Sequence, residues 1–143
     1  MAGASEILIT LPGGRRVEAQ VRGHKLLTDQ PFDNGGQDAA PSPYELFLAS
    51  IGTCAGIFVQ GFCAKREIPY ENIRIRERLV RDEAGTVTGV DLDVDLPADF
   101  PDKYREAVVK AIDGCSVKKT IAAQPVFQVR THKPGEVAAA APH

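Results

Sequence analysis

The sequence predicts an α+β fold, in which strands and helices occupy separate stretches of one domain. Two regions, 5–29 and 72–96, have strand-like patterns, and an uncharged apolar run at 46–64 lies between them. Strands therefore do not alternate with helices as they do in a parallel βαβ sheet. The 143 residues fit one domain. We expect it to span 1–132 and to be followed by a disordered Ala-rich tail over 133–143.

Three strands are predicted near the N-terminus, over about 5–11, 16–22 and 23–29. The second of them alternates apolar and polar side chains cleanly. Pro12-Gly13-Gly14 is a turn signal that would join the first two strands as a hairpin. The Asp-, Gly- and Pro-rich stretch that follows, 28–43, predicts a loop.

A long central helix is predicted from Pro43 to about residue 66, with its end marked by Pro69. Ser42 and Glu45 form the Ser-x-x-Glu pattern of a capping box, and proline is favoured at the first helical position. The run 46–64 has no charge over 19 positions, so its length leaves a membrane span open as an alternative. Because it is one segment with several polar residues among amphipathic strands, we expect a helix buried on nearly all sides of a soluble protein.

A β-hairpin is predicted over 72–81 and 87–96, with its turn at 82–85. Each strand has one apolar face and one charged face, and antiparallel pairing would bring the two charged faces together. A binding ladder is one interpretation of these charges. Because both signs are present and neutralise each other, we interpret them as a solvated face of ion pairs worth about 0–1 kcal/mol each. The charged residues are Arg74, Arg76, Arg78, Asp91, Asp93 and Asp95.

The C-terminal region predicts two helices and a last strand. Apolar residues recur at helical spacing over 101–113, and Gly114 is a natural C-terminal cap. A short helix is expected from Ser116 to Ala122. Residues 125–131 (PVFQVRT) alternate as a strand does.

Composition and charge limit the function classes. The formal net charge of −2, the absence of Trp and an aromatic content of 6% argue against nucleic acid or an anionic membrane as partner. The N-terminus has neither the basic nor the apolar region of a signal peptide, so we expect the cytoplasm, where thiols stay reduced. Three cysteines without metal-finger spacing argue against structural zinc.

The three cysteines differ in their surroundings. Cys63 lies nine residues after Cys54, about 180° around the helix, so the two do not share a face, and Cys63 is interpreted as a packing residue. Cys54 is too far from the helix start for the dipole to act, so a thiolate there needs a cation from another segment or chain. Cys115 precedes a helix start, with Lys118 and Lys119 close behind. From its position alone, Cys115 is predicted to be the more reactive thiol.

A series of short motifs spans most of the chain. They are Gly23-His24, Asp29-Gln30-Pro31, Gly35-Gly36, the run PSPYELFLASIGTC at 41–54, and Cys115-Ser116-Val117. Over about 5–132 these motifs closely resemble the OsmC/Ohr superfamily of osmotically inducible and organic hydroperoxide resistance proteins. The most specific part is the pairing of Pro-x-Glu-Leu…Gly-x-Cys with Cys-x-Val about 60 residues later.

The resemblance implies an OsmC-like fold that forms an intertwined homodimer. One long helix from each chain would pack in the centre, with Gly52 and Gly56 in the contact, and sheets of mixed origin would wrap the pair. No metal or bound organic cofactor is implied.

The resemblance also implies thiol peroxidase chemistry on organic (alkyl or lipid) hydroperoxides in oxidative stress defence. Cys54 matches the peroxidatic cysteine, which becomes a sulfenic acid, and Cys115 matches the resolving cysteine, which forms a disulfide with it. A dithiol reductant of the dihydrolipoyl kind would restore both thiols. An arginine of the N-terminal hairpin would activate the thiol; Arg15 matches best, with Arg16 and Arg22 as alternatives.

Two departures point to a divergent branch. Tyr44 stands where the superfamily's peroxidases carry Glu, and Ser116 stands where proline is usual. Glu45 lies about 180° around the helix from Cys54 and is better placed as a cap. Tyr44 is therefore a candidate binding residue, as is His24 in the loop after the second strand. A non-catalytic redox sensor or small-molecule-binding dimer with the same fold stays open as the alternative function.

Overall fold

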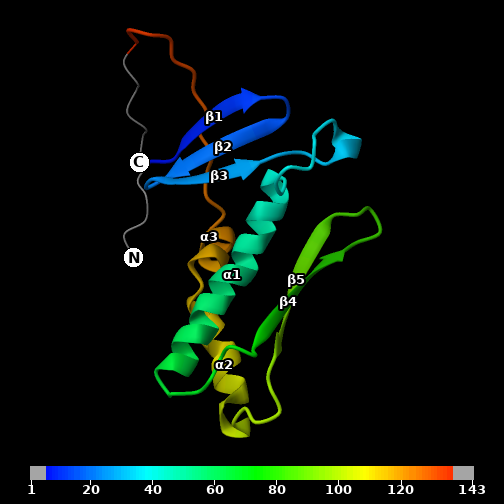
Figure 1. Ribbon diagram of the computed structural model, residues 1–143, viewed down its shortest axis with the longest axis vertical. Helices are drawn as coiled ribbons and strands as arrows, with labels where there is room; N and C mark the ends of the chain where they lie inside the picture. Colours follow the sequence, from blue (N-terminus) through cyan, green and yellow to red (C-terminus); the bar gives the residue numbers. More distant parts are fainter. Residues whose placement is uncertain (1–5, 137–143) are drawn as a thin grey trace.

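The computed structural model describes residues 6–136 and has the α+β organisation that the sequence predicts (Figure 1). Three strands at the N-terminus precede one long helix, a hairpin and two shorter helices. The elements are β1 (Leu8–Gly13), β2 (Arg16–Val21), β3 (His24–Thr28), η1 (Phe32–Asn34), α1 (Pro43–Ala64), β4 (Arg74–Arg81), β5 (Val87–Asp95), η2 (Asp102–Tyr104), α2 (Arg105–Ala111), η3 (Ile112–Gly114) and α3 (Ser116–Ala122).

The N-terminal strands form an antiparallel sheet in the order β1-β2-β3, which confirms the predicted hairpin. The β1–β2 turn lies where it was predicted, because Gly13 and Gly14 adopt φ angles of 125° and 62°, which suit glycine. This sheet lies beyond the N-terminal end of α1, and the loop 29–42 connects the two (Figure 1).

Helix α1 starts with the predicted capping box. Ser42 Oγ accepts a hydrogen bond from the Glu45 N–H at 3.3 Å, and Glu45 Oε2 accepts one from the Ser42 N–H at 2.8 Å. The helix ends slightly earlier than predicted, at Ala64. Glu67 then takes a φ of 55°, and the Ile68 N–H closes the end by donating to the carbonyl of Cys63 at 3.0 Å.

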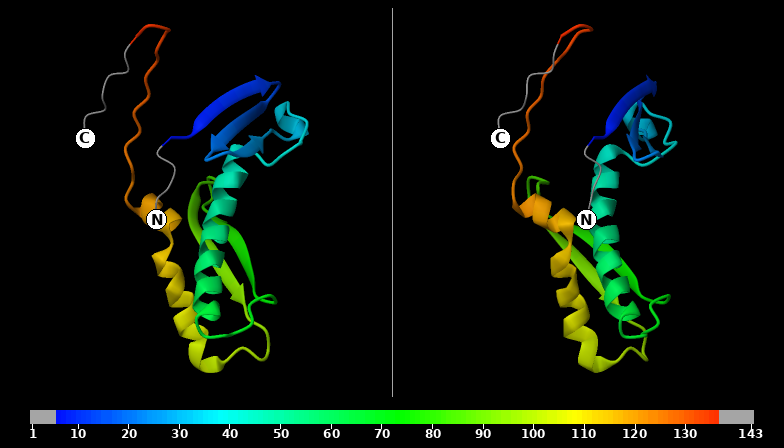
Figure 2. Two further views of the ribbon diagram at one scale, coloured as in Figure 1. Left: turned by 60° about the vertical axis from the view of Figure 1, so that its left-hand side comes forward. Right: turned by 90° about the vertical axis from the view of Figure 1, so that its left-hand side faces the viewer.

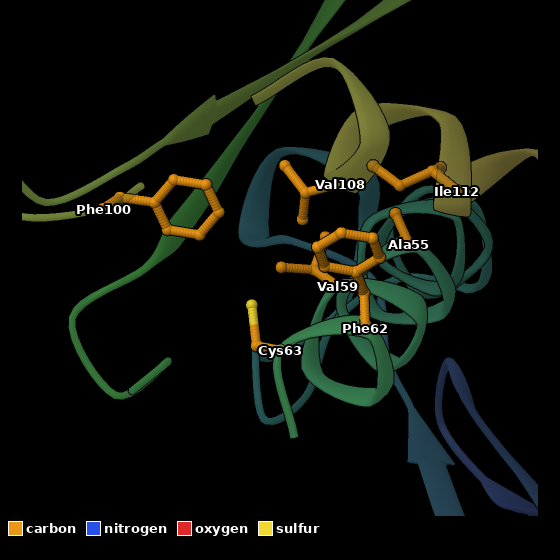
Figure 3. Packing of buried hydrophobic residues seen from close by; sticks show 7 residues of the cluster. All are labelled: Ala55, Val59, Phe62, Cys63, Phe100, Val108 and Ile112. Carbon is orange, nitrogen blue, oxygen red and sulfur yellow. The ribbon is translucent and has the colours of Figure 1, made fainter. Parts of the chain in front are cut away.

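The hydrophobic core lies towards the C-terminal end of α1. Helices α1, α2 and α3 lie together on one side of the β4–β5 hairpin (Figures 1 and 2). Side chains of α1 meet those of α2 between them, and partly buried apolar residues of β4 and β5 cover them (Figure 3). The buried cluster consists of Ala55, Val59, Phe62, Cys63, Phe100, Val108 and Ile112.

The expectation that α1 is buried on nearly all sides is wrong for the single chain. Only a stripe of its residues is buried, because the other elements of the chain reach it from one side. Ile57, on the opposite side, is 65% exposed. By length and composition α1 is able to cross a bilayer, a property it shares with core helices of soluble proteins. The buried residues are Ile51, Ala55, Val59, Phe62 and Cys63.

The β4–β5 hairpin is antiparallel, as predicted, and its register places Arg76 opposite Asp93. The ion pairs run diagonally: Arg76 donates two hydrogen bonds to Asp95, at 2.7 and 2.8 Å, and Arg78 pairs with Asp93. The hydrogen bond from Arg76 is the main reason why the pKa of Asp95 is lowered. These side chains are about half exposed to solvent, so each pair adds little stability.

The C-terminal region differs from the prediction in three ways. The helix expected over 101–113 is divided into η2, α2 and η3. Gly114 does not cap it in a left-handed conformation; it ends η3, where a Cβ would lie 2.5 Å from the ring of Phe58. Residues 125–131 join no sheet within the described chain, and Phe127 is 88% exposed. Among residues 6–136, no strand edge lies beside this segment to pair with it (Figure 2).

Helix α3 has the predicted bounds, from Ser116 to Ala122. Of the predicted tail, residues 133–136 form a turn in which the Glu136 N–H donates to the carbonyl of Lys133 at 3.1 Å. The rest of the predicted tail, 137–143, lies outside the described residues.

Candidate functional site

Cys54 faces the start of α3. It lies in the middle of α1, and the packing of α3 on α1 brings its Sγ to 3.9 Å from Ser116 Oγ, across 62 residues of sequence. Cys54 is half-buried, whereas Cys63 and Cys115 are buried.

Hydrogen bonds around the Cys54 sulfur favour its thiolate form. Burial raises the pKa of the Cys54 thiol, but hydrogen bonds from the Cys115 side chain, from the Val117 N–H and from the hydroxyl and N–H of Ser116 outweigh it. The pKa is therefore lowered overall. The groups that lower it are hydrogen-bond donors of residues 115–117 rather than the cation that the sequence led us to expect. The sequence did not reveal them because they come from a helix about 60 residues away.

Cys115 lies beside Cys54 but is fully buried. It precedes α3, and its N–H donates to the carbonyl of Ile112 at 2.9 Å. Contrary to the sequence-based expectation, the structure favours Cys54 as the more reactive thiol. Cys54 combines partial exposure with a lowered pKa, whereas burial hides Cys115 from reagents.

Cys63 is a packing residue, as predicted. It is fully buried within the cluster between α1 and α2 (Figure 3). Burial raises the pKa of its thiol, and the nearby charge of Arg66 opposes this only in part.

The other three predicted site residues lie on other parts of the single chain than the two cysteines do. Arg15 lies in the β1–β2 turn and His24 begins β3, both exposed on the N-terminal sheet. Tyr44, in the first turn of α1, is 49% exposed and stacks on Phe47 with 6.2 Å between ring centroids. The roles of these three residues stay predictions.

One of two cavities on this side of the molecule borders the site. A small one of about 220 Å³ is lined by Phe47 of α1 and by residues of α3 that include Ser116 and Val117. Phe47 lies seven residues before Cys54, about 20° away around the helix, so the cavity and the sulfur share one side of α1. A second, mainly apolar cavity of about 430 Å³ lies between β5 and the three helices. Within residues 6–136 no three His, Cys, Asp or Glu side chains gather as metal ligands do.

Asp29 is a positioning residue that the sequence reasoning missed, although its Asp-Gln-Pro motif was noted. Its side chain is 1% exposed and accepts hydrogen bonds from the N–H groups of Gln30, Gln37 and Ala39, at 2.8, 3.3 and 3.1 Å. These bonds, led by that of Ala39, hold the pKa of Asp29 below its usual value. The loop also requires Gly36, because a Cβ there would lie 1.8 Å from the carbonyl oxygen of Gln30. Asp29 thus fixes the loop that leads into α1.

Glu77 is a second unexpected residue. It projects from the inner face of β4 towards α1, and a Cβ on Gly52 would lie 2.7 Å from its Oε2. Its Oε1 is buried and has no hydrogen-bond partner within the described chain. Gly52 therefore makes room for this carboxylate, whereas the sequence assigned the glycine to contact with another helix.

Solved structures with the same fold are known. An osmotic stress and detoxification response protein from Psychrobacter arcticus 273-4 is 22% identical, with a TM-score of 0.68 over 84% of this chain and 90% of that one. An OsmC-like protein from Mycoplasma pneumoniae is 11% identical, with a TM-score of 0.66 over 85% and 89%. An organic hydroperoxide resistance protein OsmC from Legionella pneumophila is 21% identical, with a TM-score of 0.52 over 81% and 88%. At these identities the similarity establishes the fold.

The family is established by a separate match. No curated protein is significantly similar to this sequence. Residues 35–130, which include both Cys54 and Cys115, match the family described as OsmC-like protein. Since this match covers well over half of the chain and the fold agrees with it, the chain belongs to the OsmC-like protein family.

Proposed function

We propose that the protein is a thiol-dependent peroxidase that reduces organic hydroperoxides. The observation that carries this proposal is the contact of the half-buried Cys54 with residues 115–117, which lowers the pKa of its thiol. A peroxidatic cysteine needs this combination of access and thiolate character. Membership of the OsmC-like family and the name of the Legionella pneumophila structure support the choice of substrate.

The proposed reaction uses both cysteines. The Cys54 thiolate attacks the outer oxygen of the hydroperoxide, the O–O bond breaks, and the leaving alkoxide takes up a proton to become an alcohol. The sulfur is then a sulfenic acid. The Cys115 thiol attacks this sulfur, water leaves, and a Cys54–Cys115 disulfide forms. A dithiol of the dihydrolipoyl type reduces the disulfide by exchange and is itself oxidised to a disulfide.

We propose a homodimer as the working form. The exposed apolar side of α1, the apolar cavity of about 430 Å³ and the unpaired segment 125–131 are surfaces that a second copy would cover. In such a dimer, Arg15 of the N-terminal hairpin would reach the site of the other chain. Light scattering coupled to size exclusion tests this, because a monomer at micromolar concentration would contradict it. The proposed location is the cytoplasm, with neither nucleic acid nor membrane as a partner.

Intact mass spectrometry tests the peroxidase chemistry. One equivalent of an alkyl hydroperoxide should remove two hydrogens from the wild type. The variant Cys115→Ser should instead accumulate a sulfenic acid on Cys54 that a dimedone-type probe traps. Cys63→Ser is the matched control and should behave as the wild type does. An unmodified Cys54 after peroxide treatment would exclude the proposal.

A non-catalytic redox sensor or small-molecule-binding dimer is the second candidate function. The observation that favours it is the identity of residue 44. The superfamily's peroxidases carry a carboxylate at this position, whereas this chain has Tyr44, whose ring stacks on that of Phe47. Steady-state turnover with dihydrolipoamide separates the two candidates. A sensor would form the disulfide once and turn over slowly, whereas a peroxidase would consume many equivalents of hydroperoxide.

A further inference from the structure

Ser116 stands next to the Cys54 sulfur, where the superfamily pattern has a proline. Its Oγ lies 3.9 Å from Cys54 Sγ, in a hydrogen bond for which either group could be the donor. We propose that Ser116 is a catalytic residue of this chain, whose hydroxyl donates a hydrogen bond to the Cys54 thiolate. The catalytic role of Ser116 rests on the proposed function. The hydrogen bond to the Cys54 thiolate does not depend on that function.

The direction of the hydrogen bond follows from the chemistry of the two groups. A thiolate has no proton and can only accept, so the hydroxyl must donate when Cys54 is ionised. Among the described residues, the hydrogen-bond partner of the Ser116 hydroxyl is the Cys54 sulfur. The backbone N–H of Ser116 also helps to lower the pKa of the Cys54 thiol. Hydrogen bonds to a charged acceptor are about twice as strong as those between neutral groups.

A proline at this position could supply neither donor. It has no backbone N–H and no hydroxyl. The replacement of proline by Ser116 therefore adds two donors at the reacting sulfur in a chain that also lacks the carboxylate at position 44. Both donors come from the same chain as the cysteine. Cys54 should for this reason ionise readily without an arginine from a second copy.

The rate of Cys54 alkylation as a function of pH tests this inference. Iodoacetamide is used on the intact chain, and peptide mass spectrometry quantifies Cys54. Ser116→Ala should raise the apparent pKa by about one unit, so that alkylation at pH 7 slows about tenfold. Ser116→Pro, which removes both donors, should slow it further. Ser116→Thr keeps the hydroxyl and should restore most of the wild-type rate.

Two controls keep the result interpretable. Thr53→Val removes the hydroxyl of a neighbour of Cys54 that bonds the Ala49 carbonyl at 2.9 Å instead, and should leave the profile unchanged. Continued protection of the buried Cys63 from the reagent shows that each variant is folded. If the Ser116→Ala and wild-type profiles coincide in a folded variant, the inference is wrong.

Peroxide turnover is measured separately on the same proteins. If the wild type does not turn over peroxide but its Cys54 alkylation profile still changes in Ser116→Ala, the proposed function is wrong, whereas the inferred hydrogen bond is retained. If the wild type and the Ser116→Ala variant reduce the peroxide at the same rate, the inferred catalytic role of Ser116 is wrong, whereas the proposed peroxidase function is retained.

Discussion

The middle and the C-terminal end of α1 hold two thiols in contrasting surroundings. Near the middle of the helix, Cys54 meets donors from residues 115–117, and its pKa is lowered. Nine residues later, Cys63 lies in the apolar core, and burial raises its pKa. The same residue type on one helix thus becomes a candidate nucleophile or a packing residue. The difference arises from what the rest of the chain places against each side of the helix, since neither thiol is within reach of the helix start.

The largest expected effect is the contrast in alkylation between these two thiols. At pH 7 in the native protein, Cys54 should react at least about 100-fold faster than Cys63, which reacts only when the core opens. In denaturant the two rates should become equal, and a native ratio near one would contradict the comparison.

The pH dependence of this reaction has a definite sign. Because folding lowers the pKa of the Cys54 thiol, its alkylation should reach half its maximal rate at a lower pH in the native protein than in the denatured chain. For the same reason, ionisation of Cys54 adds stability that is fully present above the unfolded pKa. That stability is lost as the pH falls through the folded pKa.

Substitutions at two glycines test whether the close approach of α1 to the η3–α3 corner is needed for the high reactivity of Cys54 relative to Cys63. Gly114→Ala would place a Cβ 2.5 Å from the Phe58 ring, so we expect unfolding to become easier by about 2 kcal/mol and Cys54 to react more slowly. Gly61→Ala, within α1 where nothing lies within 4 Å, should instead stabilise by about 0.5–1 kcal/mol. Thermal or urea unfolding measures both, and equal effects would contradict the spacing argument.

Cys115→Val should make the Cys54 thiol less reactive and so reduce its difference from Cys63. The substitution keeps an apolar side chain in the buried position but removes the hydrogen bond to the Cys54 sulfur. We expect the apparent pKa of Cys54 to rise and its alkylation at pH 7 to slow about tenfold. Cys115→Ser, which retains a donor, is the control and should change the rate less.

Substitution of Cys63 is expected to have the smallest effect on the reactivity of Cys54. Cys63→Ala should lower the free energy of unfolding by about 1 kcal/mol, because it removes one buried sulfur from the core. The alkylation profile of Cys54 should not move. A change in that profile would mean that the middle of α1, at Cys54, is coupled to its C-terminal end, at Cys63.

Local signals in the sequence were enough to predict most elements of the fold. The capping box at Ser42, the alternation in β2 and β5 and the turn at Gly13 act over a few residues, so their structures follow from their neighbours. Segments that depend on distant partners were predicted less well. Residues 125–131 have a strand pattern, but the part of the chain that the structure describes places no strand beside them. Gly114 is required by the nearby ring of Phe58 rather than by a helix cap.

The candidate site was predictable only in part. Cys54 and Cys115 were identified, and the structure brings both to one place. The donors that act on Cys54 were not foreseen, because helix geometry alone says nothing of what packs against a helix. Asp29 and Glu77 were missed for the same reason, since their burial results from tertiary contacts of an ordinary acidic residue in a loop and in a strand.

The charges of the β4–β5 hairpin restrict which surfaces two copies of the chain can use to pair. All three arginines of its outer face lie on β4 and all three aspartates on β5. A two-fold axis brings identical surfaces together, so pairing of two β4 edges would place arginines opposite arginines, and pairing of two β5 edges would oppose aspartates. Both arrangements are repulsive. Two copies related by a two-fold axis are therefore directed to meet through other surfaces, and these strand edges are protected from self-association.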